Sequence, residues 1–566
     1  MQNFAYLPAT APVVRTLLPK SAPVTLSQPI PAQLIQVLHT AWKCEHCARE
    51  FKTDRGCKQH QNKCNSATIT HPTNALIGQT VAIIPVQPLA VQPLVWGSYT
   101  LEDLELIVNA TYDEIVRWRK NVFMLPSGAA GKAFIRETTR LLNLWTSEAL
   151  LSGIAWKAIM IMPSLLLQKP KYNSSSKEHS ECLKRRLENW GNGQFDVIMS
   201  ECRAIQKNLK FKSKSTNIDY IAKTFAKHVL RGNVNAALRL LDRAESSGVL
   251  PLTQKVLSEL QEKHPPAQPA DESVLIKGEE TFVDPAQFNN IDERAIFQAV
   301  MKTRGSAGPS GADANQWRRM LISKNYKDDG KELRVAIAKA ARKLCTKEIV
   351  TQNGQLDAYL SCRLIPLDKS GDGVRPIGVG EVLRRIVGKS IMRVIKPDIL
   401  ESAGSLQLCA GHTSGCEAAV HAMADIFEEE ENDGLLLIDA SNAFNALNRS
   451  VLLHNIGHIC PPMAMYVRNC YRRPSRLFIT GGGEITSSEG TTQGDPAAMS
   501  AYGVGITPLF KLCRQDSPTV KQAGFADDLI GAEKLIALRK YWDSVNTYGP
   551  ALGYYPKASK TWLVVK

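Results

Sequence analysis

Three aspartates in strand-like surroundings are the residues of this sequence best suited to chemistry. Two of them, Asp527 and Asp528, are adjacent within residues 524–530 (GFADDLI) and have mostly apolar flanks. This pattern predicts a β-hairpin with both carboxylates at or beside its tight turn. Like charges packed this closely are unfavourable unless a cation neutralises them. The alternative is a solvated turn, since Asp is a common turn residue.

The third aspartate, Asp439, directly follows the apolar run of residues 434–438 (GLLLI). A continuous apolar run that ends in Asp predicts a buried central strand with its carboxylate at the strand end. Because Asp439 lies far from Asp527 in the sequence, the fold must bring the two residues together before they can share a cation.

A second group of residues has the spacing of metal ligands. The pattern is C-x2-C-x12-H-x3-C, which suits a tetrahedral zinc site made from Cys44, Cys47, His60 and Cys64. The segment resembles the classical zinc-finger family, with Cys64 in place of the usual final His. We therefore expect a small ββα finger over residues 42–66 that holds Zn²⁺. Its basic residues favour contact with nucleic acid, and protein binding is the alternative.

Overall charge points to the class of partner. The 566-residue chain carries a formal net charge of +15, which favours a polyanion such as nucleic acid, with an anionic membrane as the alternative. Residues 150–167 are apolar but include Lys157 and Pro163, so they predict a buried core helix and no membrane span. The 13 cysteines are scattered and odd in number, which favours free thiols in a reducing nuclear or cytoplasmic location. No secretory signal is expected.

Composition changes divide the first half of the chain into segments. Residues 1–41 are poor in charge and predict a disordered leader before the finger. Residues 67–98 predict a proline-rich linker, residues 99–245 a mostly helical extension, and residues 246–285 a second linker.

Seven short motifs in the second half occur in the order found in one enzyme family. Each motif is weak alone, but the set is specific, and it resembles the reverse transcriptases of eukaryotic retroelements, most closely the non-LTR branch. The motifs are residues 308–311 (GPSG), 363–369 (RLIPLDK), 374–378 (VRPIG), 439–445 (DASNAFN), 490–496 (GTTQGDP), 525–528 (FADD) and 553–561 (GYYPKASKT).

The resemblance implies an α+β fold with the fingers and palm of a right-hand polymerase. Fingers are expected over residues 286–400 and the palm over residues 401–566, after the helical region and the zinc finger. Because few residues follow the last motif, we expect no thumb in this chain.

The resemblance also implies roles for individual residues. Asp439, Asp527 and Asp528 would be the catalytic carboxylates that hold two Mg²⁺ ions, with Mn²⁺ as an alternative and the carbonyl of Ala440 as a further ligand. Lys560 would protonate the departing pyrophosphate, although an ordinary exposed lysine at a strand end is nearly as good an interpretation.

A further group of residues would bind the incoming nucleotide. Lys369 and Arg375 would clamp the triphosphate, and Gln493 with Gly494 would lie against the sugar and base. Phe444 falls where the family places a bulky side chain under the sugar 2′ position, which favours deoxynucleotides.

We therefore expect an RNA-directed DNA polymerase of a retrotransposon. Its expected partners are an RNA template, a DNA primer or target DNA, and deoxynucleoside triphosphates. The alternative is a truncated or co-opted copy that binds nucleic acid without catalysis. The sequence leaves the oligomeric state open.

Overall fold

The computed structural model describes only part of the chain, in two separate units, residues 1–90 and 91–566. The described residues are 42–43, 50–51, 99–147, 153–209, 218–230, 232, 234, 237–238, 248–349, 356–369 and 373–566. In the first unit, β1 (Trp42–Lys43) pairs in antiparallel fashion with β2 (Glu50–Phe51). The predicted leader lies outside the described residues, and so do the four residues predicted to bind zinc, Cys44, Cys47, His60 and Cys64. The zinc finger therefore stays a prediction.

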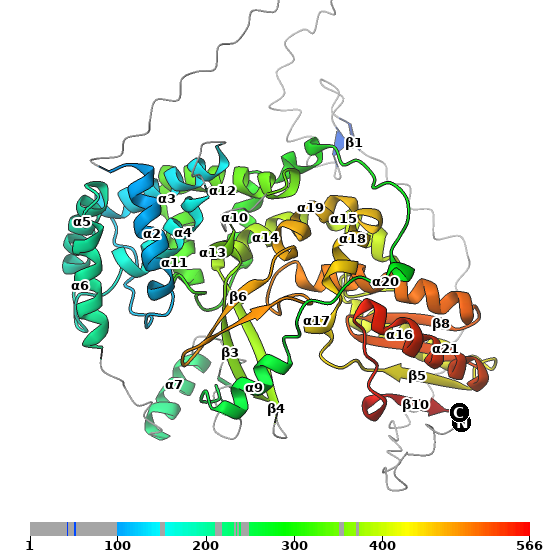
Figure 1. The fold of residues 1–566 in the computed structure, drawn as a ribbon. Helices are drawn as coiled ribbons and strands as arrows, with labels where there is room; N and C mark the ends of the chain where they lie inside the picture. The colour runs from blue at the N-terminus through cyan, green and yellow to red at the C-terminus, as the bar shows by residue number, and fades with distance from the viewer. Residues whose placement is uncertain are drawn as a thin grey trace, which may run out of the picture. The chain divides into compact units, whose positions relative to one another are not determined.

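The second unit combines many helices with two four-stranded sheets, which confirms the α+β class (Figure 1). Its earlier helices are α2 (Leu101–Ile115), α3 (Ala129–Thr146), α4 (Ile154–Leu166), α5 (Ser176–Gly191), α6 (Phe195–Lys207), α7 (Ile218–Leu230), α9 (Gln254–Glu262), α10 (Glu293–Lys302), α11 (Ala314–Ile322), α12 (Lys327–Thr346) and α13 (Asp357–Leu360). Its later helices are α14 (Val382–Val394), α15 (Lys396–Ala403), α16 (Gly415–Glu428), α17 (Ala443–Ala446), α18 (Arg449–Ile459), α19 (Pro461–Tyr471), α20 (Ala498–Asp516) and α21 (Leu535–Tyr548). Short 3-10 turns are η1 (Glu272–Val274), η2 (Pro285–Asn290), η3 (Lys324–Tyr326), η4 (Pro550–Leu552) and η5 (Ala558–Lys560).

The described parts of residues 99–245 are mainly helical, as predicted. Helix α2 begins after Thr100 because the Thr100 side chain accepts a hydrogen bond from Asp103 N, and the Asp103 carboxylate accepts one from Thr100 N. Helix α4 is buried along almost its whole length, which confirms the predicted core helix. Within the described ranges, no helix has the length and apolar character needed to cross a membrane.

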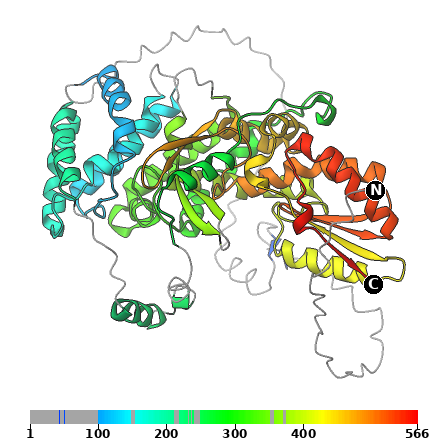
Figure 2. The ribbon, with the colours of Figure 1, turned by 60° about the horizontal axis from the view of Figure 1, so that its bottom comes forward.

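One four-stranded sheet carries the predicted catalytic aspartates, and we call it the aspartate sheet. It consists of β5 (Gly434–Ile438), β8 (Lys521–Phe525), β9 (Asp528–Glu533) and β10 (Trp562–Val565), in the order β10-β5-β9-β8 and antiparallel throughout. Alternating side chains of β5 point to opposite faces. Leu435 packs in a cluster with Met423 of α16, whereas Leu436 and Ile438 join the main core. As a result, β5 is a central strand with helices packed on the sheet (Figure 2).

The other four-stranded sheet takes two strands from before β5 and two from after it, and we call it the hairpin sheet. It consists of β3 (Cys362–Lys369), β4 (Gly373–Gly380), β6 (Ser475–Ile479) and β7 (Glu484–Ser487), in the order β4-β3-β6-β7. Strands β3 and β4 form an antiparallel hairpin, and β3 pairs in parallel with β6. The sheet therefore joins the segment before α14 to the segment after α19.

Residues 246–285 are not the linker that their prolines predict. In the described part, Val249 bridges Leu367 of β3, and Leu250 N donates to Pro366 O over 2.9 Å. Helix α9 then packs on the hairpin sheet and buries Val256 and Leu260 in its core. This first half of the segment is therefore part of the hairpin sheet's own core.

The second half of the same segment reaches the helices beside the aspartate sheet. Asn442 Nδ2 donates to Lys263 O, and Asn448 Nδ2 donates to Pro269 O, each over 2.9 Å. Asn455 Nδ2 donates to Val274 O over 2.9 Å and accepts from Ile276 N. We call residues 248–280 the strap; after α9, side-chain amides of Asn442, Asn448 and Asn455 satisfy part of its backbone.

Packing of α9 predicts that the strap contributes to stability. Leu260→Ala should lower the free energy of unfolding by about 2–5 kcal/mol, because Leu260 is fully buried against the hairpin sheet. Chemical denaturation measures this change. Gln261→Ala in the same helix is the control, since Gln261 is exposed and its truncation should change little. Equal stabilities for the two variants would show that α9 is not packed as described.

Candidate active site

The hairpin predicted at residues 524–530 is present. Phe525 pairs with Asp528, so Ala526 and Asp527 form the two-residue turn between β8 and β9. Strand β5 pairs with β9, and the last pair in this ladder is Ile438 with Leu529. The next residue on each strand is therefore Asp439 or Asp528, and the three aspartates meet at one end of the aspartate sheet.

The three carboxylates influence one another electrostatically. Burial raises the pKa of Asp527, and the negative charge of Asp439 raises it further. Partial burial raises the pKa of Asp528, with added contributions from Asp527 and Asp439. Raised carboxyl pKa values mean that the ionised carboxylates are poorly stabilised at this end of the sheet, because burial removes solvent and the like charges repel. All-oxygen ligands with an excess of negative charge fit hard divalent cations such as Mg²⁺.

One cation of the chain already contacts this group. Lys560 Nζ donates to Asp439 Oδ2 over 2.6 Å. In the described part of the chain, no three His, Cys, Asp or Glu side chains already surround a single metal position. The side chains of Asp439 and Lys560 are 26% and 44% exposed, so their ion pair contributes only about 0–1 kcal/mol. A pair this weak can separate when a divalent cation binds.

Backbone contacts hold the segment that carries Lys560 beside β5. Lys557 N donates to Asp439 O, and Ser441 N donates to Tyr555 O, each over 2.8 Å. Ala440, the predicted carbonyl ligand, forms an isolated bridge with Pro556. The segment therefore runs along both residues that follow Asp439.

The residues predicted to bind triphosphate lie in the same cationic neighbourhood. Partial burial lowers the pKa of Lys369, and the positive charges of Lys560, Lys263, Arg375 and Lys557 lower it further. Lys369 ends β3, and Arg375 lies opposite Leu367 on β4. The tip of the hairpin sheet thus brings positive charge close to the aspartates.

The turn that presents Asp527 has an unusual backbone conformation. Ala526 has φ of 59°, in the left-handed region that non-glycine residues avoid at a cost of about 1–2 kcal/mol. The fully buried Gln407 holds this residue in place, because its Oε1 accepts from Ala526 N over 2.8 Å and its Nε2 donates to Ala526 O over 3.0 Å. Asn442, three residues after Asp439, is also left-handed, with φ of 51°.

Tyr554 is a second residue that supports the turn. Its buried hydroxyl donates to Asp527 O over 2.9 Å and lies 3.4 Å from Ile438 O. Sequence reasoning did not assign a role to Tyr554 or Gln407. Tyr554 at least lies within a recognised motif, whereas no local pattern marks Gln407, whose partner is more than a hundred residues away.

Phe444 lies on the short helix α17 and packs against α20. Its ring stacks on Tyr502, with a centroid distance of 4.6 Å and an interplanar angle of 27°. Phe444 O accepts a hydrogen bond from Thr491 N over 2.6 Å. A Cβ at Gly490 would lie 2.1 Å from Phe444 O, so this close approach requires glycine. The structure therefore joins Phe444 to the loop that carries Gln493.

That loop is fixed by a buried ion pair and by contact with β4. Asp495 pairs with Arg384 of α14, and both side chains are at most 2% exposed. Asp495 Oδ1 also accepts from Ala497 N over 2.8 Å. Gly494 has φ of 100°, and a Cβ there would lie 2.8 Å from Gly378 O. Gln493 and Gly494 are consequently held against β4.

The hold on the Asp527 turn can be tested through Gln407. Gln407→Leu should lower the free energy of unfolding by about 2–4 kcal/mol, because it leaves the buried N–H and C=O of Ala526 without partners. Adding Ala526→Gly should return about 1 kcal/mol, since glycine tolerates positive φ. Thermal or chemical unfolding of the single and double variants measures both changes. A Gln407→Leu variant as stable as the wild type would contradict the described turn.

A scan against protein-family models found no match for this chain, and a search of curated proteins found no significant match. The resemblance described above therefore depends on the motifs themselves. The arrangement of their side chains in space is an independent source of argument for function.

Proposed function

We propose that this chain is an RNA-directed DNA polymerase, a reverse transcriptase of a retroelement. The observation that carries the proposal is the meeting of Asp439, Asp527 and Asp528 at one end of a sheet, next to a cluster of lysine and arginine side chains. Nucleotidyl transfer requires both features, because carboxylates must hold divalent cations and cations must bind a triphosphate.

In this proposal the hairpin sheet and the helices around it are polymerase fingers, over residues 286–400, and the aspartate sheet belongs to a palm, over residues 401–566. The antiparallel order of the aspartate sheet and the position of the carboxylates at its β5 and β9 ends support the assignment. Strand β6 falls in the palm range by sequence yet pairs with β3, so the two parts share one sheet.

Asp439, Asp527, Asp528 and the carbonyl of Ala440 would hold two Mg²⁺ ions. When bound, such ions activate the primer 3′ oxygen and neutralise charge on the triphosphate. The raised pKa values of Asp527 and Asp528 support this role, because a bound cation would stabilise carboxylates that burial and mutual repulsion destabilise.

Lys369 and Arg375 would bind and orient the triphosphate. Both lie on the β3–β4 hairpin, whose end lies close to Lys560. Lys560 would leave Asp439 when the site is loaded and donate a proton to an oxygen of the departing pyrophosphate. The weak, partly exposed ion pair between Lys560 and Asp439 supports such a release.

Phe444, Gln493 and Gly494 would bound the sugar and base of the incoming nucleotide. The stacking of Phe444 on Tyr502 supports a fixed ring, and a fixed ring can exclude a ribose 2′-hydroxyl. Deoxynucleotides would then be the preferred substrates.

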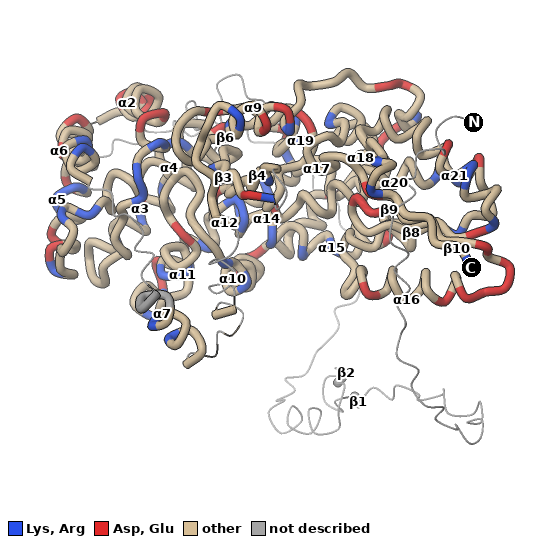
Figure 3. The backbone as a smooth tube through the Cα atoms, turned by 90° about the horizontal axis from the view of Figure 1, so that it is seen from below, with Lys and Arg blue, Asp and Glu red and all other residues tan. Residues whose placement is uncertain are grey.

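Nucleic acid would be the macromolecular partner, as an RNA template with a DNA primer or target DNA. The net charge of +15 supports this partner. Lys and Arg residues occur along α12 and α14 in the centre of the second unit (Figure 3). The finger proposed at residues 42–66 would hold Zn²⁺ through Cys44, Cys47, His60 and Cys64 and would add a further contact to nucleic acid.

Primer extension on an RNA template with deoxynucleotides and Mg²⁺ tests the proposal. The wild-type chain should add nucleotides, and Asp527→Asn or Asp527→Ala should reduce the rate at least about a hundredfold, because a ligand of the cations is lost. Single-nucleotide incorporation is the best readout.

Asp543→Asn is the matched control, because Asp543 lies on the surface of α21 and pairs with Arg539. It should keep the wild-type rate. Extension that survives Asp527→Ala would contradict the role of Asp527. Tight template–primer binding without extension by the wild type would favour the alternative of a non-catalytic binding protein.

Sugar selection tests the role of Phe444. Phe444→Ala should raise the efficiency of ribonucleotide relative to deoxynucleotide incorporation by about 10- to 200-fold, since it removes the ring that would meet a 2′-hydroxyl. Ratios of kcat/KM for the two substrates measure the effect. Phe282→Ala is the control, because Phe282 is 84% exposed. An unchanged ratio in the Phe444 variant would exclude Phe444 as the residue that selects the sugar.

A further inference from the structure

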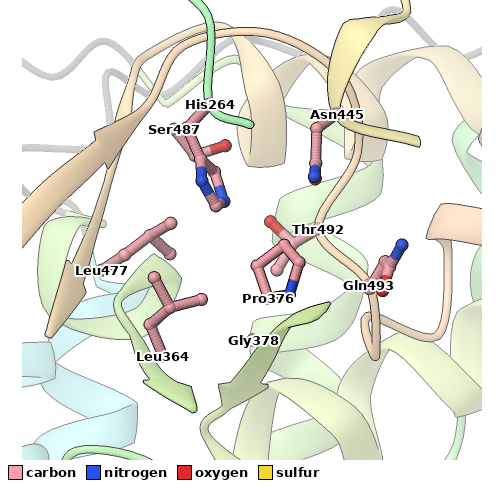
Figure 4. A pocket seen from close by; sticks show the side chains of 9 residues that line it. All are labelled: His264, Leu364, Pro376, Gly378, Asn445, Leu477, Ser487, Thr492 and Gln493. Carbon is pink, nitrogen blue, oxygen red and sulfur yellow. The ribbon is translucent and has the colours of Figure 1, made fainter. Parts of the chain in front are cut away.

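The strap contributes one side chain to a pocket between the hairpin sheet and the loop that carries Gln493. That side chain is His264, two residues after the end of α9, and it extends into the pocket beside Ser487, with Asn445 on another side of the pocket (Figure 4). Neither the motifs nor the resemblance points to His264. It reaches this position because α9 packs on the hairpin sheet and Asn442 binds the carbonyl of Lys263.

The hydrogen bond of its first ring nitrogen defines what His264 presents. Nδ1 lies 2.7 Å from Leu260 O, and a carbonyl oxygen can only accept, so Nδ1 carries the proton. Burial lowers the pKa of His264, which keeps the ring neutral at physiological pH. In a neutral ring the other nitrogen, Nε2, is an acceptor. No described residue hydrogen-bonds Nε2, so this nitrogen is free to accept a hydrogen bond from a ligand.

Two hydroxyl groups that line the pocket can also form hydrogen bonds with a ligand. Thr492 is only 8% exposed, and its Oγ1 is buried without a hydrogen-bond partner among the described residues. Ser487 Oγ accepts from Arg449 Nη2, which leaves its own proton free to donate. A buried hydroxyl without a partner costs free energy unless a ligand or water satisfies it.

The walls and size of the pocket restrict its occupant. Leu364, Leu477 and Pro376 give it apolar walls, and its described lining has no charged side chain. Its enclosed volume is about 10 Å³, which is room for about one water molecule or one hydroxyl group, and the surrounding space is open to solvent. A hydroxyl group of a nucleotide fits this description, whereas a phosphate group does not.

We infer that His264 is a specificity-determining residue whose Nε2 accepts a hydrogen bond from a sugar hydroxyl of the nucleic acid or nucleotide beside Gln493. This inference rests on the proposed polymerase function. Two hydroxyls share the required chemistry, the 2′-hydroxyl of an RNA template and the 3′-hydroxyl of the incoming deoxynucleotide.

The experiment compares His264→Ala and His264→Phe, which lack the acceptor, with His264→Gln, which retains one. Single-nucleotide kcat and KM are measured on RNA and DNA templates of the same sequence, with deoxynucleotide and with dideoxynucleotide. Loss of one hydrogen bond should lower kcat/KM by about two- to tenfold. His264→Gln should retain more of the wild-type efficiency than either other variant.

The four substrate combinations distinguish the two hydroxyls. A loss confined to RNA templates identifies the template 2′-hydroxyl. A loss confined to deoxynucleotide, on both templates, identifies the 3′-hydroxyl. His454→Ala is the matched control, because His454 Nε2 contacts Ile276 O of the strap over 2.9 Å but does not line the pocket. His454→Ala should leave two ratios of kcat/KM unchanged: that of RNA to DNA template, and that of deoxynucleotide to dideoxynucleotide.

Other outcomes overturn the inference. Equal losses for all four combinations would mean that His264 only supports the fold, and no loss would mean that it contacts no substrate. In both cases the wild type is active and the proposed function stands. A wild-type chain that extends no primer, on either template, overturns the proposed function itself and this inference with it.

Discussion

Pairing of β5 with β9 is the constraint on which the candidate site depends. The ladder places Asp439 and Asp528 side by side and Asp527 in the adjoining turn, so three negative charges meet at one sheet end. Burial, and then repulsion from the neighbouring carboxylates, raises the pKa of Asp527 and Asp528. The site is thereby suited to cations, and the surrounding lysines supply some of the missing charge. Hydrogen bonds of the sheet backbone hold together side chains that would otherwise separate.

The loops at this end of the sheet are held by residues that do no chemistry themselves. Gln407 binds both backbone groups of Ala526, and Tyr554 binds the carbonyl of Asp527. Left-handed backbone occurs at Ala526, directly before Asp527, and at Asn442, three residues after Asp439. Strained residues of this kind persist where the surrounding structure determines their conformation. The positions of the carboxylates are therefore set by contacts with remote parts of the chain.

The strap is also held by contacts with remote parts of the chain, and it positions His264 in the pocket beside Gln493. It belongs to the core of the hairpin sheet through α9, and its later part is held by the side-chain amides of Asn442, Asn448 and Asn455. A segment that crosses between two sheets can carry a side chain to their boundary, and here that side chain is His264. The strap thus contacts both the hairpin sheet and the helices beside the aspartate sheet.

Local patterns in the sequence were enough to predict the Asp527 hairpin, the strand that ends before Asp439, the buried helix α4 and the helical character of the described parts of residues 99–245. Each of these depends on periodicity and composition over a few neighbouring residues. Only the tertiary structure decided that Lys560 pairs with Asp439, that Gln407 supports Ala526, and that residues 248–280 are a strap and not a linker. Prolines and polar residues do predict irregular backbone, and the strap is irregular after α9. Whether such backbone is solvated or packed depends on partners hundreds of residues away, which no local pattern contains.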